Sequence, residues 1–354
     1  MTASLNADCP KNELHPGTPF AQQRRSQEEW LMKLGVFTAT LQELPLAEAL
    51  DIVQSLGVES VDFSTGGFGS KAHCDPEVLL TDPARLDRFR EAVMGRGLEI
   101  SALSFYGNPL HPDREVALRH RREFRNTILL AERLGIERVV TLSGCPGDPT
   151  EPGYPNWIVY PWPAELVELY RWQWDEVLIP FWAAEAAFAI EHGVQDICLE
   201  LHAVNLVYNP ETLLELRRWV GDVISACVNP GHLFWQGIDP VQALRALSGA
   251  IGYVHVTDCR VDPVIAPRNG VLDAKEFRHE LDRSWQFRTL GYGHGEETWR
   301  HIVLALRLAG YDDVISLEHE DTMLLPADGL RHSIEFLRRV VVREPLRVLE
   351  PHPG

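Results

Sequence analysis

Polar residues that could do chemistry follow four apolar segments in the second half of the chain. These segments end in the runs Leu199–His202, Val228–His232, Val254–Asp258 and Leu317–Asp321. Each run places a carboxylate, amide or imidazole group directly after residues typical of a buried strand. Alternate residues of a strand point the same way, so Glu200 can share a face with His202, and Glu318 with Glu320.

One group from each run could bind a divalent metal ion. Such ions take oxygen and imidazole ligands and keep open positions for a substrate. The predicted metal ligands are Glu200, Asn229, His255 and Glu318. This set suits Mn²⁺ best, and Mg²⁺, Co²⁺ and Zn²⁺ are alternatives. A single Glu or His at a strand end is more often a surface or capping group, but four in succession favour a metal site.

Other residues are candidates for proton transfer or for substrate contacts. The candidate catalytic residues are Glu200, Glu318, His202 and His294. The histidines qualify because their side chains titrate near neutral pH. The candidate substrate-binding residues are Asn108, His111, Trp157, His232, Asp258 and Arg260. For Asn108, His111 and Arg260 a structural role is the competing interpretation, and Asp258 could cap the turn that follows it.

The elements that must position these residues alternate in a regular rhythm. The predicted strands are Leu34–Phe37, Ser60–Phe63, Leu98–Leu103, Arg138–Leu142, Asp196–Leu201, Val223–Val228, Gly252–Val256 and Val314–Glu318. The predicted helices are Pro45–Leu56, Asp82–Arg96, Arg114–Leu134, Pro163–His192, Pro210–Val220, Pro240–Leu247, Glu296–Ala309 and Ala327–Val342. Eight strand–helix units predict an α/β fold, a single-domain (β/α)₈ barrel at 33–345, with an N-terminal extension at 1–32 and a C-terminal tail at 346–354. An open dinucleotide-binding sheet is less favoured, because no G-x-G-x-x-G follows the first strand.

Two connections are unusually long, and both should emerge at the C-terminal face, where barrel enzymes build their active sites. They span residues 143–165, after the fourth strand, and 257–295, after the seventh. The first is rich in aromatic residues, including Trp157, Tyr160 and Trp162. Such rings can stack on sugars and aryl groups, but they are also enriched at subunit interfaces.

Charge and composition exclude several classes of protein. The 354 residues carry a formal net charge of −18, which disfavours nucleic acid and anionic membranes as partners. No apolar run is long enough to span a bilayer, and the N-terminus lacks the pattern of a secretory signal. The six cysteines show no C-x-x-C spacing and are interpreted as free thiols. We therefore expect a cytoplasmic protein.

The segments LELHAVNLVYNPETL, VNPGHLFWQGIDP, YVHVTDCR and ISLEHED resemble the xylose-isomerase-like barrel superfamily of sugar isomerases and epimerases. The resemblance covers roughly residues 33–342. It implies metal ligands of the types Glu, Asp, His and Glu, which fall on Glu200, Asn229, His255 and Glu318. Asn229 departs from this pattern and carries no charge. The implied chemistry is proton abstraction beside a carbonyl, with a metal that polarises the carbonyl oxygen.

Within that superfamily, the combined pattern resembles the catalytic subunits of bacterial C-glycoside deglycosidases. This resemblance implies a lyase that acts on 3-keto-glycosides and eliminates the aglycone, and it implies a small second subunit. A homo-oligomer is the alternative assembly. A sugar isomerase or epimerase with the same metal site is the alternative function, and a non-catalytic barrel subunit, suggested by Asn229, is a second. An endonuclease of the same fold is disfavoured by the charge.

Overall fold

The computed structural model describes residues 32–150 and 153–343, and within them eight parallel strands close into a barrel. The strands are β1 (Lys33–Phe37), β2 (Ser60–Gly67), β3 (Glu99–Tyr106), β4 (Arg138–Thr141), β5 (Asp196–Glu200), β6 (Ile224–Val228), β7 (Ile251–Val256) and β10 (Val314–Leu317). Neighbours in the barrel are neighbours along the chain, except that β10 pairs with both β7 and β1. The pairing of Lys33 with Val314 therefore closes the barrel with its first and last strands.

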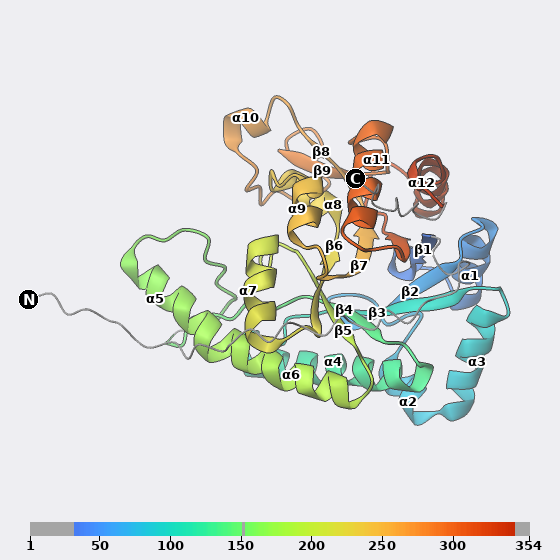
Figure 1. Cartoon of the computed structure of the whole chain (residues 1–354), viewed down its shortest axis with the longest axis horizontal. Helices are drawn as coiled ribbons and strands as arrows, with labels where there is room; N and C mark the ends of the chain where they lie inside the picture. Colours follow the sequence, from blue (N-terminus) through green and yellow to red (C-terminus); the bar gives the residue numbers. More distant parts are fainter. Residues whose placement is uncertain (1–31, 151–152, 344–354) are drawn as a thin grey trace, which may run out of the picture.

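Helices surround this barrel and cover its outer face (Figure 1). They are α1 (Leu46–Ser55), α2 (Pro76–Thr81), α3 (Pro83–Met94), α4 (Arg114–Leu134), α5 (Ala164–Trp172), α6 (Ile179–Glu191), α7 (Pro210–Val220), α8 (Pro230–Trp235), α9 (Pro240–Ala246), α10 (Ala266–Asn269), α11 (Glu296–Leu308) and α12 (Pro326–Val340). Most strand residues are buried on both faces, as expected for a parallel sheet covered by helices. The predicted barrel fold is confirmed.

Local signals in the sequence explain where the helices begin and end. α4 begins after Asp113, whose side chain accepts hydrogen bonds from the N–H groups of Glu115 and Val116. It ends at Gly135, whose φ of 72° lies in the left-handed region that glycine adopts without a steric penalty. α7 begins with a reciprocal capping box between Asn209 and Thr212.

Three parts of the fold differ from the sequence-based prediction. The helix predicted at Pro163–His192 is divided into α5, a π-helical segment η3 (Gln173–Leu178) and α6. The long connection after β7 contains an antiparallel pair, β8 (Asp258–Val261) and β9 (Trp285–Arg288), followed by the loop to α11. The short helices α2 and α8 were not predicted, because six residues are too few to show a helical period.

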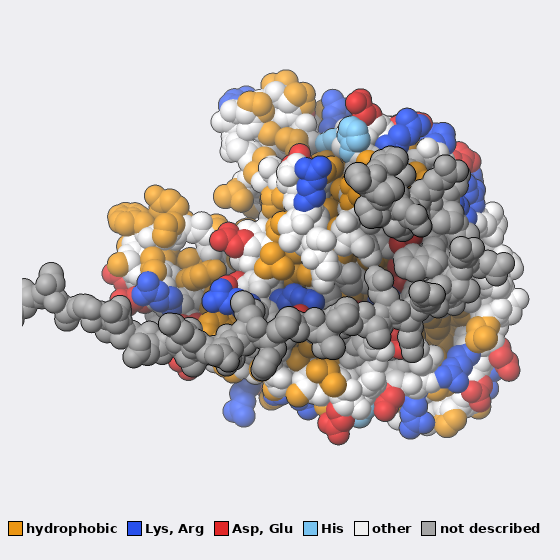
Figure 2. Space-filling model, in the orientation of Figure 1, with side chains coloured by type: hydrophobic (Ala, Val, Ile, Leu, Met, Phe, Trp, Pro, Cys, Tyr) orange, Lys and Arg blue, Asp and Glu red, His pale blue; other side chains and the backbone are white. Residues whose placement is uncertain are grey.

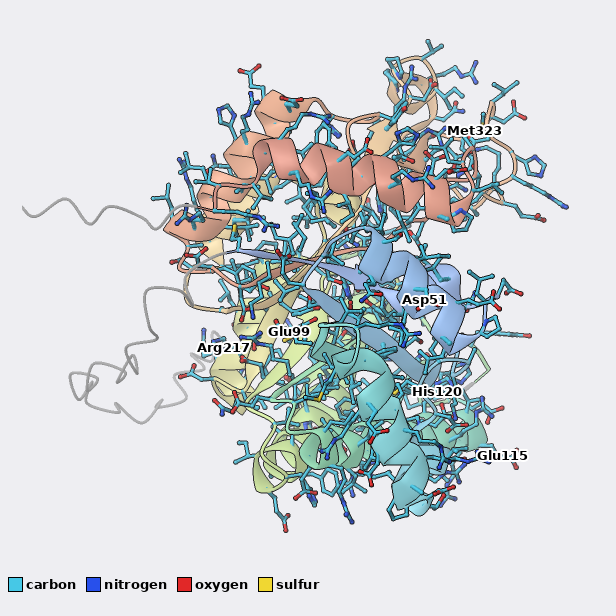
Figure 3. All side chains as sticks on the ribbon, turned by 90° about the vertical axis from the view of Figure 1, so that its right-hand side faces the viewer. Asp51, Glu99, Glu115, His120, Arg217 and Met323 are labelled. Atoms are coloured by element: carbon cyan, nitrogen blue, oxygen red, sulfur yellow. The ribbon has the colours of Figure 1, made fainter. Side chains whose placement is uncertain are left out.

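The two ends of the barrel lie on opposite sides of the molecule (Figure 3). Glu99 begins β3 at the N-terminal end, and Met323 follows β10 at the C-terminal end. The additional elements β8, β9 and α10 lie next to α8, at the top of the molecule in Figure 1. Within the described residues, no helix is both long and apolar enough to cross a membrane. The predicted extension up to residue 31 and the tail from 346 lie outside the described residues.

Candidate active site at the C-terminal end of the barrel

A cavity of about 490 Å³ opens at the C-terminal ends of the strands, within the size range of small-molecule sites. Its wall includes Glu200 at the end of β5, His202 just after it, His232 in α8, and Glu318 and Glu320 after β10. The rest of the wall is formed by Phe37, Ala39, Thr40, Gln42, Ser64, Phe68, Gly69, Ser70, Tyr106, Leu142 and His319. The cavity thus brings together residues from both halves of the chain.

A buried carboxylate fixes the orientation of His255 below this cavity. His255 Nε2 lies 2.8 Å from Asp62 Oδ2, and both side chains are wholly inaccessible to solvent. The Ser104 and Ser316 hydroxyls also donate to Asp62. An ionised carboxylate only accepts hydrogen bonds, so His255 carries a proton on Nε2. Its other nitrogen, Nδ1, faces Tyr106 and Glu200.

Glu200 is the most heavily hydrogen-bonded carboxylate in the cavity wall. Its Oε2 accepts a 2.5 Å bond from the Tyr106 hydroxyl, and its Oε1 lies 3.1 Å from His232 Nε2. Burial alone would raise the pKa of Glu200, but hydrogen bonds from His232 and His255 hold it well below its usual value. Burial alone would lower the pKa of His255, yet Cys227 and Asp62 raise it well above the usual value. The site therefore pairs an anionic carboxylate with an imidazole that favours its charged form.

The pKa of Glu318 is shifted in the opposite direction to that of Glu200. The Asn229 amide donates to Glu318 Oε2 at 3.2 Å. Burial raises the pKa of Glu318 well above its usual value, and the nearby carboxylates Glu320 and Glu200 raise it further. Two carboxylates in one cavity, with pKa values shifted in opposite directions, are typical of sites that transfer protons.

The amide oxygen of Asn229 is already occupied by protein donors. It accepts hydrogen bonds from the Gly231 N–H at 3.1 Å, the Thr257 N–H at 3.2 Å and the Thr257 hydroxyl at 2.7 Å. Two of these donors are backbone N–H groups, which fix the assignment of the amide oxygen and nitrogen. Asn229 also caps the N-terminus of α8. The structure therefore directs its NH₂ group, rather than its oxygen, toward Glu318.

His202 and His232 lie side by side in the wall, with ring centroids 4.3 Å apart. Burial and the neighbouring His232 lower the pKa of His202 to about 4. His202 Nδ1 lies 2.6 Å from the Ala203 carbonyl oxygen and so acts as a donor there. His202 is therefore connected to Glu200 through His232, whose Nε2 faces Glu200 Oε1.

Two of the predicted residues, His294 and Asp258, form a separate pair outside the cavity wall. His294 Nδ1 lies 2.8 Å from Asp258 Oδ1, and the His294 ring stacks on Phe234. The other Asp258 oxygen accepts the N–H groups of Gly291, Gly293 and His294. The glycine-rich run therefore surrounds a carboxylate of the protein itself, and this pair anchors the loop that follows β9.

The remaining predicted substrate-binding residues also lie outside the cavity wall. Both ends of the Asn108 amide bind the backbone of Cys145. His111 Nδ1 accepts the N–H of Asp113 before α4. Trp157 packs edge-on against Tyr208, and Arg260 is exposed on β8.

Three residues that the sequence analysis did not select contact the predicted ones directly. They are Asp62, Tyr106 and Cys227. Asp62 gave a usable signal, because a carboxylate in the middle of an apolar strand needs a buried partner. Tyr106 ends β3 as an ordinary aromatic strand residue, and Cys227 is indistinguishable in sequence from a buried core thiol.

The chemistry of the donor set fits a divalent cation. A metal-ligating histidine usually donates its second ring N–H to a carboxylate, and the pairing of His255 with Asp62 has this arrangement. Among the residues that the structure describes, Glu200, Cys227 and His255 offer potential ligand atoms that all lie within 4.8 Å of one another. A metal site is therefore possible at the centre of the barrel mouth.

Comparisons with known proteins agree with this fold. The model of the xylose isomerase-like TIM barrel matches residues 50–340. The uncharacterized protein YfiH of Bacillus subtilis (strain 168) is 35% identical over 312 residues, which cover 88% of this chain and 99% of that protein.

Solved structures with little sequence similarity share the architecture. The IOLI protein with a bound zinc atom superposes with a TM-score of 0.62 at 19% identity, covering 88% of this chain and 99% of that one. An L-ribulose 3-epimerase superposes with a TM-score of 0.59 at 19% identity, covering 88% and 95%. Because the family model spans most of the barrel, the chain belongs to the xylose isomerase-like TIM barrel family.

Proposed function

We propose that this protein is a divalent-metal-dependent enzyme that removes the proton beside a carbonyl group of a keto-sugar. The favoured substrate is a 3-keto-glycoside from which the aglycone is then eliminated. The observation that carries the proposal is that Glu200 and Glu318 line the same cavity. His255, oriented by Asp62, lies below that cavity. Removal of a proton beside a carbonyl requires a group that takes the proton and a group that stabilises the resulting negative charge. A carboxylate can do the first, and a bound metal can do the second.

The metal would be held at the Glu200 and His255 end of the cavity, with Glu318 on the neighbouring strand. When bound, it would polarise the substrate carbonyl as a Lewis acid. The oxygen and nitrogen ligands predicted from the sequence favour manganese. Asn229 is the weakest member of that predicted set, because its oxygen accepts three hydrogen bonds from the protein.

The side chains of the wall would move the protons. A carboxylate takes the proton from the carbon beside the carbonyl, and the electron pair of the broken C–H bond then expels the aglycone from the adjacent carbon. The departing aglycone receives a proton from a second group. Glu200 and Glu318 are the proposed acid and base, and His232, 3.1 Å from Glu200, is placed to exchange a proton with it.

The size and lining of the cavity support a glycoside. A cavity of about 490 Å³ exceeds what a single sugar ring requires. Phe37, Phe68 and Tyr106 offer aromatic surface for a sugar face or an aryl group. Ser64 is 3% exposed, and its hydroxyl has no hydrogen-bond partner among the described residues, so a substrate hydroxyl could bind there.

A sugar isomerase or epimerase is the second candidate. The presence of two carboxylates in one cavity favours it, because an epimerase needs one group to remove a proton and a second to return it. The sugar epimerases among the structural neighbours share the fold, which both candidate reactions can use.

The test is a metal-reconstituted activity screen with product analysis. Chelator-treated protein is loaded separately with Mn²⁺, Zn²⁺, Co²⁺ and Mg²⁺ and incubated with an aryl 3-keto-glucoside and with free ketoses. Release of the aglycone only in the presence of metal supports the lyase. Interconversion of ketoses without aglycone release supports the epimerase. Bound metal without turnover of either substrate class contradicts both, and failure to bind metal would indicate a non-catalytic subunit.

A further inference from the structure

Cys227 is the buried thiol closest to the proposed metal position. It lies on β6 two residues before Asn229, so both side chains point to the same side of the strand. Its Sγ lies 3.6 Å from His255 Nδ1. Among the described His, Cys, Asp and Glu side chains, Glu200, Cys227 and His255 offer potential ligand atoms that all lie within 4.8 Å of one another.

We propose that Cys227 is a metal ligand, that it binds as a thiolate together with Glu200 and His255, and that Asn229 does not ligate. This inference rests on the proposed function, because it assigns the ligands of the metal on which that function depends. It also changes the expected metal from Mn²⁺ to a softer ion. Thiolate ligands select Zn²⁺, or Co²⁺ as its substitute, over Mn²⁺.

The hydrogen bonds of Asn229 argue against its oxygen as a ligand. A ligating oxygen would have to give up bonds from Gly231 and Thr257, two of which come from backbone N–H groups that then lose a buried partner. Asn229 presents its NH₂ group to Glu318, and a donor group cannot bind a cation. The residue is therefore a positioning residue for Glu318 and for the start of α8.

Two of the three separations between the potential ligand atoms are close to those of a small tetrahedral site. Zn–S bonds of about 2.3 Å and Zn–N bonds of about 2.0 Å at a tetrahedral angle place sulfur and nitrogen roughly 3.5 Å apart. The observed distance between Cys227 Sγ and His255 Nδ1 is 3.6 Å. Glu200 Oε2 lies 3.7 Å from the same nitrogen. All three atoms lie within 4.8 Å of one another, so the side chains must shift to bring them into bonding distance of one ion.

The charge of the site also favours a thiolate. Of the four ligands predicted from the sequence, only Glu200 and Glu318 can carry a negative charge, and Glu318 is not part of the close group of Glu200, Cys227 and His255. Within that group, Glu200 alone would give a divalent ion a single negative charge. A Cys227 thiolate adds a second negative charge and balances the ion. The thiol proton, together with the Nδ1 proton of a charged His255, is released to solvent when the metal binds, because both ligand atoms must be deprotonated. The Tyr106 hydroxyl, which donates to Glu200, must turn away as the cation takes that lone pair.

The experiment is Co²⁺ substitution of the full chain, followed by absorption spectroscopy and competition with Zn²⁺. Thiolate ligation of Co²⁺ produces an intense sulfur-to-metal charge-transfer band in the near ultraviolet. We expect this band in the wild type. In Cys227→Ser we expect the band to vanish. We expect the Zn²⁺ dissociation constant to rise by roughly 100-fold or more, which exceeds the 10–100-fold weakening typical when a residue that contacts a ligand, but not the metal, is replaced.

Cys198→Ser is the matched control. Cys198 is as deeply buried as Cys227 and belongs to the same small core cluster on the neighbouring strand β5. This variant should keep both the band and the Zn²⁺ affinity. Asn229→Ala should change Zn²⁺ affinity less than Cys227→Ser does, since it removes a positioning residue rather than a ligand.

The outcomes separate the inference from the proposed function. A wild-type protein that binds Co²⁺ without a charge-transfer band, or a Cys227→Ser variant that retains the band, overturns the assignment of Cys227 but leaves the metal enzyme intact. A wild-type protein that binds neither Co²⁺ nor Zn²⁺ overturns both. If Cys227→Ser does not fold, as judged by circular dichroism, the wild type and Cys198→Ser are compared instead. A band in both shows that a thiol other than Cys198 ligates, and no band in the wild type overturns the assignment.

Discussion

At the scale of single residues, Asp62 controls the geometry of the candidate site. It is wholly buried and holds His255 through Nε2, while the hydroxyls of Ser104 and Ser316 also donate to its oxygens. A buried carboxylate without such partners would be strongly destabilising. Asp62 therefore determines which nitrogen of His255 is available to a metal.

Replacement of Asp62 tests this role. We predict that Asp62→Asn weakens metal binding by about 10- to 100-fold, because His255 loses the carboxylate that fixes its tautomer and orientation. Isothermal titration calorimetry measures the change. Asp51→Asn, at an exposed position of helix α1, is the control and should bind metal like the wild type. Unchanged affinity in Asp62→Asn would show that His255 does not ligate.

Glu318 is the residue whose loss should affect turnover most selectively. We predict that Glu318→Gln lowers kcat by about 10²- to 10⁴-fold, the usual contribution of a positioned acid or base, and leaves the thermal unfolding midpoint nearly unchanged. Glu297→Gln is the control, because Glu297 is exposed in the first turn of α11 and does not line the cavity. Equal activity in Glu318→Gln and wild type would remove Glu318 from the mechanism.

At the scale of elements, His120 connects α4 to the segment that follows β3. It is 2% exposed, and its Nδ1 lies 3.0 Å from the Asn108 N–H. Its ring also packs edge-on against Phe68 and Phe105. Burial lowers the pKa of His120, since the charged form would lose its hydration.

This shift predicts a loss of stability in mild acid. As the pH falls through the unfolded-state value of about 6.5, the unfolded chain takes up a proton that the folded His120 does not, so the free energy of unfolding decreases. Urea denaturation at pH 7.5 and 5.5 measures the decrease. His120→Gln should be less stable than wild type at pH 7.5, but its free energy of unfolding should decrease less between pH 7.5 and pH 5.5. An equal decrease in both proteins would refute the assignment.

The helix α5 differs from the other long helices in having no buried residue. It projects from the barrel, and hydrophobic side chains gather on it and on the preceding loop (Figures 1 and 2). Tyr160 and Trp162 in that loop are 65% and 70% exposed. A helix of nine residues gains little stability from its own hydrogen bonds without packing.

We therefore predict that the amides of α5 exchange with deuterium faster than those of α7, which buries Leu213 and Leu216 and has a capping box. Hydrogen-exchange mass spectrometry at micromolar protein concentration provides the comparison. Equal protection of the two helices would show that another surface covers α5 in solution, and a dilution series would show whether that surface is a second copy of the chain.

At the scale of the whole molecule, the barrel was predictable because its signals are local and repeated. Each of the eight strands was predicted within a few residues, since an apolar run and a following helical pattern need no knowledge of the rest of the chain. Gly57, Gly97, Gly135, Gly193 and Gly310 directly follow predicted helices, and all have positive φ.

The site was predictable only where strand ends determine it. Glu200, His202, His232 and Glu318 line one cavity because parallel strands end at the same face of a barrel. The direction of the Asn229 amide depends on Thr257, which is 28 residues away. His294 follows a loop that turns away from the cavity toward Phe234. Contacts of this kind depend on the conformation of loops. Loops show no periodic sequence pattern from which that conformation could be predicted.

The pairing of β1 with β10 has a consequence for how the chain is made. During synthesis β1 is among the first strands to leave the ribosome, but its partner is complete only at Leu317. Until then β1 and β7 each expose an unpaired edge, and exposed edges promote association between chains. Fragments that end before Val314 should therefore aggregate when expressed, whereas the chain that includes β10 should not. Soluble, monomeric behaviour of such a fragment in a sedimentation assay would show that the nascent barrel is protected in some other way.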